Sequence, residues 1–128
     1  MKLQPDNIDT LAVTGHGNGW IAISGERFNE SQMINSKGQI VPFSVRSWDA
    51  LKWEDFEPLM QWAKMGIELL VFGTGDKQRF LSPQWIVKLN AAGLGVESMN
   101  TPAACRTYNI LAGEGRAVAA VLMIEHKD

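Results

Sequence analysis

Two short signals, Ser82-Pro83 and Thr101-Pro102, constrain the fold of this chain more than any other feature. A hydroxyl residue followed by proline is typical of a helix start, because the hydroxyl caps a free backbone N–H and proline fits the first helical position. Each signal follows a stretch of strand character, residues 67–72 in one case and 95–99 in the other. This repeated order of strand and helix predicts an α/β architecture with a partly parallel central sheet.

A first helix and a last strand complete this part of the chain. Apolar residues recur at helical spacing over residues 56–63, and we expect Asp55 to be the N-cap of that helix. Pro58 then falls within the first turn, where proline is tolerated. Residues 117–124 read as the last buried strand, and the sequence leaves its direction open.

The first third of the chain has a different pattern, which predicts two hairpins. Residues 11–14 and 20–24 flank the glycine-rich turn 15–19, and residues 32–35 and 39–42 flank a second turn. The expected fold is therefore a single compact three-layer α/β domain. It has a mixed central sheet, three helices and an antiparallel β section from the N-terminal third.

Composition sets the domain organisation and excludes several classes of protein. The chain has 128 residues, a net charge of −2 and one cysteine. We expect a flexible segment at 1–10, one domain at 11–124 and a polar tail at 125–128, with no transmembrane segment and no signal peptide. The charge favours neither nucleic acid nor an anionic membrane, and one cysteine excludes a disulfide framework. These features predict a cytoplasmic protein.

The loops after the two predicted parallel strands form the candidate site, since such loops converge at one edge of a sheet and bind ligands there. Arg79 and Arg106, each near a helix start, could hold a carboxylate or phosphate. Alternatively, each arginine braces loop carbonyls or an acidic neighbour such as Asp76 or Glu97. The candidate ligand- or anion-binding residues are Gly73, Thr74, Gly75, Arg79, Thr101, Cys105, Arg106 and Asn109.

Catalytic, metal and cofactor sites are harder to assemble from this sequence. Cys105 could be a nucleophile, but helical spacing places it on the face against the sheet, and only His16 and His126 could serve as its base. One turn histidine without other ligands is no metal site. Gly73 and Gly75 resemble a dinucleotide fingerprint that lacks its third glycine. We therefore predict no catalytic residue, no metal and no cofactor.

Five tryptophans are many for this length, and Trp48 and Trp53 are the candidate interface residues because they flank polar positions before the first helix. Aromatic anchors dominate interface energies, which favours a protein partner or a homodimer. The alternative is that these rings fill the core, as most tryptophans do.

The glycine pair with Arg79, the stretch Cys105-Arg106-Thr107-Tyr108-Asn109 and the later Glu114-Gly115-Arg116 together resemble a known family. It comprises small bacterial and archaeal domains of unknown function and includes mitochondrial complex I assembly factor 3 and an adipogenesis-associated protein. The resemblance implies a compact α/β fold and carries no established reaction.

Two functions follow as hypotheses. The first is a non-catalytic binding or assembly domain whose cleft, at Gly73–Gly75 with Arg79 and at Thr101–Arg106, takes a peptide or an anion. The second is an enzyme for a small anionic substrate, clamped by Arg79 and Arg106, with Cys105 or Tyr108 as the chemical group. The sequence favours the first, because no base is positioned for catalysis.

Overall fold

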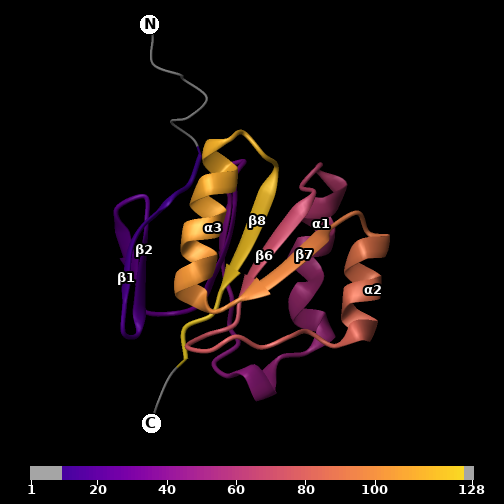
Figure 1. Ribbon diagram of the computed structural model, residues 1–128, viewed down its shortest axis with the longest axis horizontal. Coiled ribbons are helices and arrows are strands. Elements are labelled where there is room, and N and C mark those ends of the chain that lie inside the picture. The colour runs from indigo at the N-terminus through magenta and orange to yellow at the C-terminus, as the bar shows by residue number, and fades with distance from the viewer. Residues whose placement is uncertain (1–9, 126–128) are drawn as a thin grey trace, which may run out of the picture.

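The computed structural model describes residues 10–125 and shows a central sheet with helices on both faces (Figure 1). The sheet has the order β5-β4-β8-β6-β7. Its strands are β4 (Gln32–Asn35), β5 (Ile40–Pro42), β6 (Leu69–Gly73), β7 (Gly95–Met99) and β8 (Val118–Leu122). β6 is parallel to β7 and β8, whereas β4 is antiparallel to β5 and β8. The predicted mixed sheet is confirmed. The last strand, β8, whose direction the sequence left open, is parallel to β6 and antiparallel to β4.

Three α-helices, as predicted, cover this sheet: α1 (Glu57–Lys64), α2 (Pro83–Ala91) and α3 (Thr101–Gly113). Side chains alternate between the two faces of each strand. Leu70 and Phe72 therefore join the core under α1 and α2, while Val71 joins the core under α3. The α3 core contains small residues such as Ala104 and Ala120, so this helix packs close to the sheet.

The antiparallel section is present and divides between two sheets. β1 (Val13–Gly17), β2 (Trp20–Ile23) and β3 (Glu26–Phe28) form a small separate sheet beside α3, and β4 and β5 extend the central one. The sequence did not predict β3, a strand of three residues without alternating apolar positions. The first hairpin is also tighter than expected, because β1 continues through the glycines to Gly17.

Two predicted helix caps need correction. Asp55 does not cap α1: a 3-10 turn, η3 (Trp53–Phe56), precedes that helix, and the Asp55 carboxylate accepts from the Lys52 N–H at 2.7 Å. At α3 the cap is Asn100, whose Oδ1 accepts from the Ala103 N–H at 2.9 Å. Ser82 caps α2 as expected. Another 3-10 turn, η2 (Trp48–Ala50), lies before η3.

Most of the predicted terminal segments lie outside the described residues. Of the segment 1–10 the structure describes Thr10, and of the tail 125–128 it describes Glu125. None of the helices formed by residues 10–125 is long and apolar enough to cross a bilayer.

Candidate functional site

The two predicted loops meet at the carboxyl ends of β6 and β7, where Thr101 joins them. The Thr101 N–H donates to the Gly75 carbonyl at 2.8 Å, and the Gly75 N–H donates to Thr101 Oγ1 at 2.9 Å. The same hydroxyl donates to the Met123 carbonyl at 2.6 Å. Because Thr101 does not cap its own helix, its side chain is available to bind three segments together.

Glycine is favoured at both loop positions for different reasons. Gly73 lies against the start of α3, and a Cβ atom there would be 3.0 Å from the Ala104 Cβ and 3.1 Å from the Thr101 Cα. Gly75 has a φ of +104°, which favours glycine, and a Cβ atom would lie 2.5 Å from a Glu125 carboxylate oxygen. The loop is therefore shaped to receive the Glu125 side chain.

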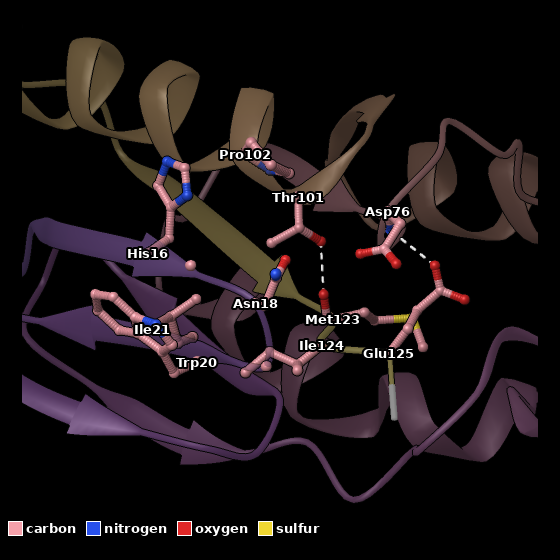
Figure 2. Close-up of a pocket in the computed structure, with 12 residues that line it drawn as sticks. His16, Asn18, Trp20, Ile21, Asp76, Thr101, Pro102, Met123, Ile124 and Glu125 are labelled. Atoms are coloured by element: carbon pink, nitrogen blue, oxygen red, sulfur yellow. Dashed lines mark hydrogen bonds between the residues drawn. The ribbon is translucent and has the colours of Figure 1, made fainter. Parts of the chain in front are cut away.

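The Glu125 carboxylate occupies the position at which the sequence predicted an anion. Its Oε1 accepts from the Asp76 N–H at 2.7 Å, and its Oε2 accepts from Arg79 Nη2 at 3.1 Å (Figure 2 shows the Asp76 bond). Arg79 Nη1 also donates to the Thr74 carbonyl at 2.7 Å. Arg79 thus braces a loop carbonyl and an acidic residue, which is the alternative interpretation, with Glu125 as the partner. We call residues 73–79, Thr101 and Glu125 the loop junction.

The N-terminus of α3 has its backbone donors satisfied within the protein. The Thr101 N–H binds the Gly75 carbonyl, the Ala103 N–H binds the Asn100 side chain, and the Ala104 N–H binds the Asn100 carbonyl. Pro102 has no N–H to offer. An external anion at this helix end would have to displace one of these contacts.

Arg106 lies apart from the loop junction. Its exposed side chain lines a hollow of about 250 Å³ between β1 and α3, which Arg79 does not line. The walls are residues 13–16 of β1 and Pro102, Cys105, Arg106 and Asn109 of α3. We call it the β1–α3 hollow. A clamp made by both arginines would require Arg79 to leave Glu125 and to reach this second place.

Asn109 and Tyr108 attach the small sheet to α3. The Asn109 side chain accepts from the Val13 N–H and donates to the Val13 carbonyl, both at 2.8 Å. The Tyr108 hydroxyl donates to the Leu11 carbonyl at 2.8 Å. The amide of Asn109 pairs with β1 as a neighbouring strand would, so its polar atoms serve the fold.

Cys105 is buried, as its helical spacing predicted, with 2% of its surface exposed. Burial raises the pKa of its thiol from 9.0 to about 11, although its own backbone and Arg106 act in the opposite direction. Burial also raises the pKa of Tyr108. Both side chains are therefore protonated at neutral pH. That state makes Cys105 a poor nucleophile.

A second hollow, of about 170 Å³, lies between the β1–β2 hairpin and the loop junction (Figure 2). Residues 16–21 line one side, and Thr101, Pro102, Asp76 and residues 123–125 line the other. Sequence reasoning treated His16 as a turn residue and Glu125 as part of the tail, and so missed both. The only signal for this hollow was the glycine-rich turn.

Trp48 and Trp53 are half-buried and join an aromatic cluster. The Trp48 ring meets Phe72 edge-on at 6.0 Å between centroids, and the Trp53 ring lies 6.4 Å from that of Trp85. Phe80, which the sequence analysis did not single out, is 75% exposed on the loop after Arg79. The Arg79 guanidinium carbon lies 5.9 Å from the Trp48 ring centroid, which places the start of this loop beside the tryptophans. We call Trp48, Trp53 and Trp85, together with Phe80 next to Arg79, the aromatic surface.

Within residues 10–125, no group of three or more His, Cys, Asp or Glu side chains is placed to hold a metal ion.

Residues 13–123 match a family described as a protein of unknown function (DUF498/DUF598). Human NADH dehydrogenase [ubiquinone] 1 alpha subcomplex assembly factor 3 is 34% identical over 125 residues, which cover 94% of this chain and 65% of that protein. The chain spans between about half and two thirds of the length of such assembly factors.

Solved structures agree on the fold. A crystal structure of a Bordetella parapertussis protein has a TM-score of 0.82 and 34% identity, covering 91% of this chain and 97% of that one. A solution structure from Bordetella pertussis, described as an Mth938-like domain, has a TM-score of 0.82 and 28% identity, covering 100% and 95%.

Proposed function

This chain belongs to the DUF498/DUF598 family of proteins of unknown function, and from that premise we propose that it is a non-catalytic protein-binding domain of the assembly-factor type. The relatives named as complex I assembly factor 3 support this role. By analogy with their name, the partner is a subunit of a respiratory NADH dehydrogenase. The cell compartment in this proposal is the cytoplasm, where a single thiol stays reduced.

The observation that carries the proposal is the aromatic surface. Phe80 has the largest exposed fraction, 75%, among the large apolar side chains that residues 10–125 expose. It follows Arg79, whose guanidinium carbon lies 5.9 Å from the Trp48 ring centroid. Aromatic residues in contact with arginine are the residue types that dominate binding energy at interfaces. We propose that the partner docks here, with Trp48 and Trp53 as half-exposed anchors.

The candidate loop residues hold Arg79 in place beside this surface. Thr74 accepts from the Arg79 N–H at 3.1 Å, and Arg79 is held by Thr74 and Glu125. These hydrogen bonds restrict the conformations that residues 74–79 can adopt before a partner binds. A surface that is already ordered loses less entropy when a partner docks. Gly73, Gly75 and Thr101 serve in this proposal as the frame of the binding site.

Comparing Phe80→Ser with Val87→Ser tests the proposal. Val87 is also apolar and 65% exposed, but it lies on α2 outside the aromatic surface. Cross-linking in cells that make a respiratory NADH dehydrogenase, followed by mass spectrometry, should retrieve one of its subunits with the wild type and with Val87→Ser. Phe80→Ser should retrieve about tenfold less, as expected when an interface anchor is lost.

Two results would count against the proposal: no subunit retrieved by the wild type, or equal retrieval by both variants. The homodimer predicted from the sequence stays a prediction. If the aromatic surface instead joins two copies of this chain, Phe80→Ser will convert a dimer into a monomer in sedimentation measurements.

A further inference from the structure

Arg106 lines the β1–α3 hollow, and Arg116 lines another hollow, of about 220 Å³, with Lys37 near the end of α3. The other three arginines of the chain have partners within the protein. Arg79 is paired with Glu125, Arg46 lies 3.6 Å from Glu30, and Arg27 stacks on Trp20 at 4.3 Å from the ring centroid. The Arg106 side chain, in contrast, makes no hydrogen bond or ion pair with any of residues 10–125. Its guanidinium is exposed at the rim of a hollow of about 250 Å³.

The lining of this hollow carries positive charge without a compensating carboxylate. Its ionisable side chains are Arg106 and Cys105 from α3 and His16 from β1. The Cys105 thiol is neutral, because burial raises its pKa to about 11. Neither β1 nor α3 contains an aspartate or glutamate. The chain as a whole has a charge of −2, so the positive charge in the lining of this hollow is a local feature.

The walls of the hollow are held in place before any ligand arrives. Both polar atoms of Asn109 are bonded to Val13, and Cys105 forms a buried floor. Figure 2 shows the His16 ring extending from β1 toward the start of α3 near Pro102. The Asn109 side chain is therefore used by the fold. Thr14 Oγ1 accepts from the Gly25 N–H at 3.0 Å, and the nitrogen donors of the lining that can reach a ligand are on Arg106 and His16.

We propose that the β1–α3 hollow binds a carboxylate carried by an acidic segment of the protein partner, an inference that rests on the proposed function. The flat guanidinium offers two parallel N–H donors that match the two oxygens of a carboxylate, and His16 adds a third donor from the opposite wall. An exposed ion pair is weak by itself. The aromatic surface belongs to the α1 and α2 side of the central sheet, whereas the hollow lies on the α3 side, so the acidic segment has to extend from the docked partner around the edge of the sheet. A segment long enough to span that distance presents its carboxylate at a raised effective concentration.

Nuclear magnetic resonance can test the site without the partner. The probes are the peptide acetyl-Ala-Glu-Ala-amide, its glutamine counterpart, and inorganic phosphate, each at constant ionic strength. The glutamate peptide should shift the Arg106 Nε–Hε and His16 resonances and saturate on the order of millimolar concentration. The glutamine peptide should leave both unchanged, and phosphate should bind no more tightly than the glutamate peptide.

Variants assign the effect to the hollow. Arg106→Gln should weaken binding of the glutamate peptide about tenfold, because it removes the paired guanidinium donors and their charge at an exposed position, where such a pair contributes little. Arg116→Gln, which removes an exposed arginine outside this hollow, should leave binding unchanged. Equal shifts with the glutamine peptide, tighter binding of phosphate, or equal effects of the two variants would each overturn the proposal.

Partner capture separates this proposal from the proposed function. If the glutamate peptide binds at Arg106 but no subunit is retrieved, the assembly role fails and the carboxylate site stands. If Phe80→Ser reduces capture while the peptide does not bind, the carboxylate site fails alone. If both hold, Arg106→Gln should also reduce capture of the subunit, and more strongly at low salt than at high salt.

Discussion

The loop junction and the β1–α3 hollow both adjoin the start of α3, and each contains an arginine that the sequence assigned to an anion. In the junction, Arg79 is bonded to a carbonyl and to a carboxylate of the same chain. In the hollow, the Arg106 side chain is exposed and makes no hydrogen bond or ion pair with residues 10–125. The two arginines differ because Glu125, 46 positions from Arg79, folds back onto the loop. Whether an arginine is free to bind a ligand therefore depends on the tertiary structure and not on its local sequence.

Among the variants considered, Thr101→Val should have the largest effect on the stability of the loop junction. The two side chains have nearly the same shape, but valine leaves the buried Gly75 N–H and the Met123 carbonyl without the partner they now share. Each unsatisfied buried group costs about 1–3 kcal/mol, so we expect the free energy of unfolding to fall by about 3 kcal/mol. Urea denaturation measures this change.

Thr107→Val is the matched control for that experiment. Thr107 lies on the same helix, half-exposed, and its side chain makes no hydrogen bond with residues 10–125. Its replacement should change the free energy of unfolding by less than about 0.5 kcal/mol. Equal losses in the two variants would mean that helix propensity, and not the junction, sets the stability.

Much of the fold could be predicted from local patterns. Ser82-Pro83 identified the start of α2 correctly, because the cap and the proline are adjacent in the sequence. Thr101-Pro102 identified α3, but its cap is Asn100, one residue earlier. Both Asn100 and Thr101 can cap a helix. Which of them does so depends on the Gly75 and Met123 backbone, which the local sequence does not contain.

The site could be predicted only in part, for a similar reason. Parallel pairing of β6 and β7 implied that the loops after them meet, and they do. Glu125 lies far along the chain, and no local pattern points it toward Gly75. The hollow beside Arg106 also depends on distant contacts, since the bonds from Asn109 to Val13 join residues 96 positions apart.

The pH dependence of stability tests whether water is excluded from the Cys105 thiol beneath the β1–α3 hollow. The folded Cys105 thiol has a pKa of about 11 against its ordinary 9.0, because the thiolate is disfavoured by burial. Below pH 9 the thiol is neutral in both states. As the pH rises from 9 to 11 the unfolded chain ionises first, so this contribution to stability is lost and amounts to about 2 kcal/mol.

Cys105→Ala isolates that contribution from the other groups that titrate at high pH, Tyr108 among them. The free energy of unfolding of the wild type, under reducing conditions, should approach that of the variant by about 2 kcal/mol between pH 9 and 11. Parallel curves would show that water reaches the thiol. Rapid modification of Cys105 by a thiol reagent at pH 7 in the native state would show the same.

The smallest expected effects compare the two arginines directly. Arg79→Ala removes two charge-assisted hydrogen bonds, one to the Thr74 carbonyl and one to the Glu125 carboxylate, which is about four fifths buried, so the free energy of unfolding should fall by about 1–2 kcal/mol. Arg106→Ala should change it by less than about 0.5 kcal/mol, because an exposed side chain without partners contributes little. If the free energy of unfolding falls equally in the two variants, Arg106 has a structural role and the hollow is not free to bind a carboxylate.

If Arg106→Ala instead raises the free energy of unfolding, the exposed charge destabilises the fold, which is the trade-off expected at a binding site.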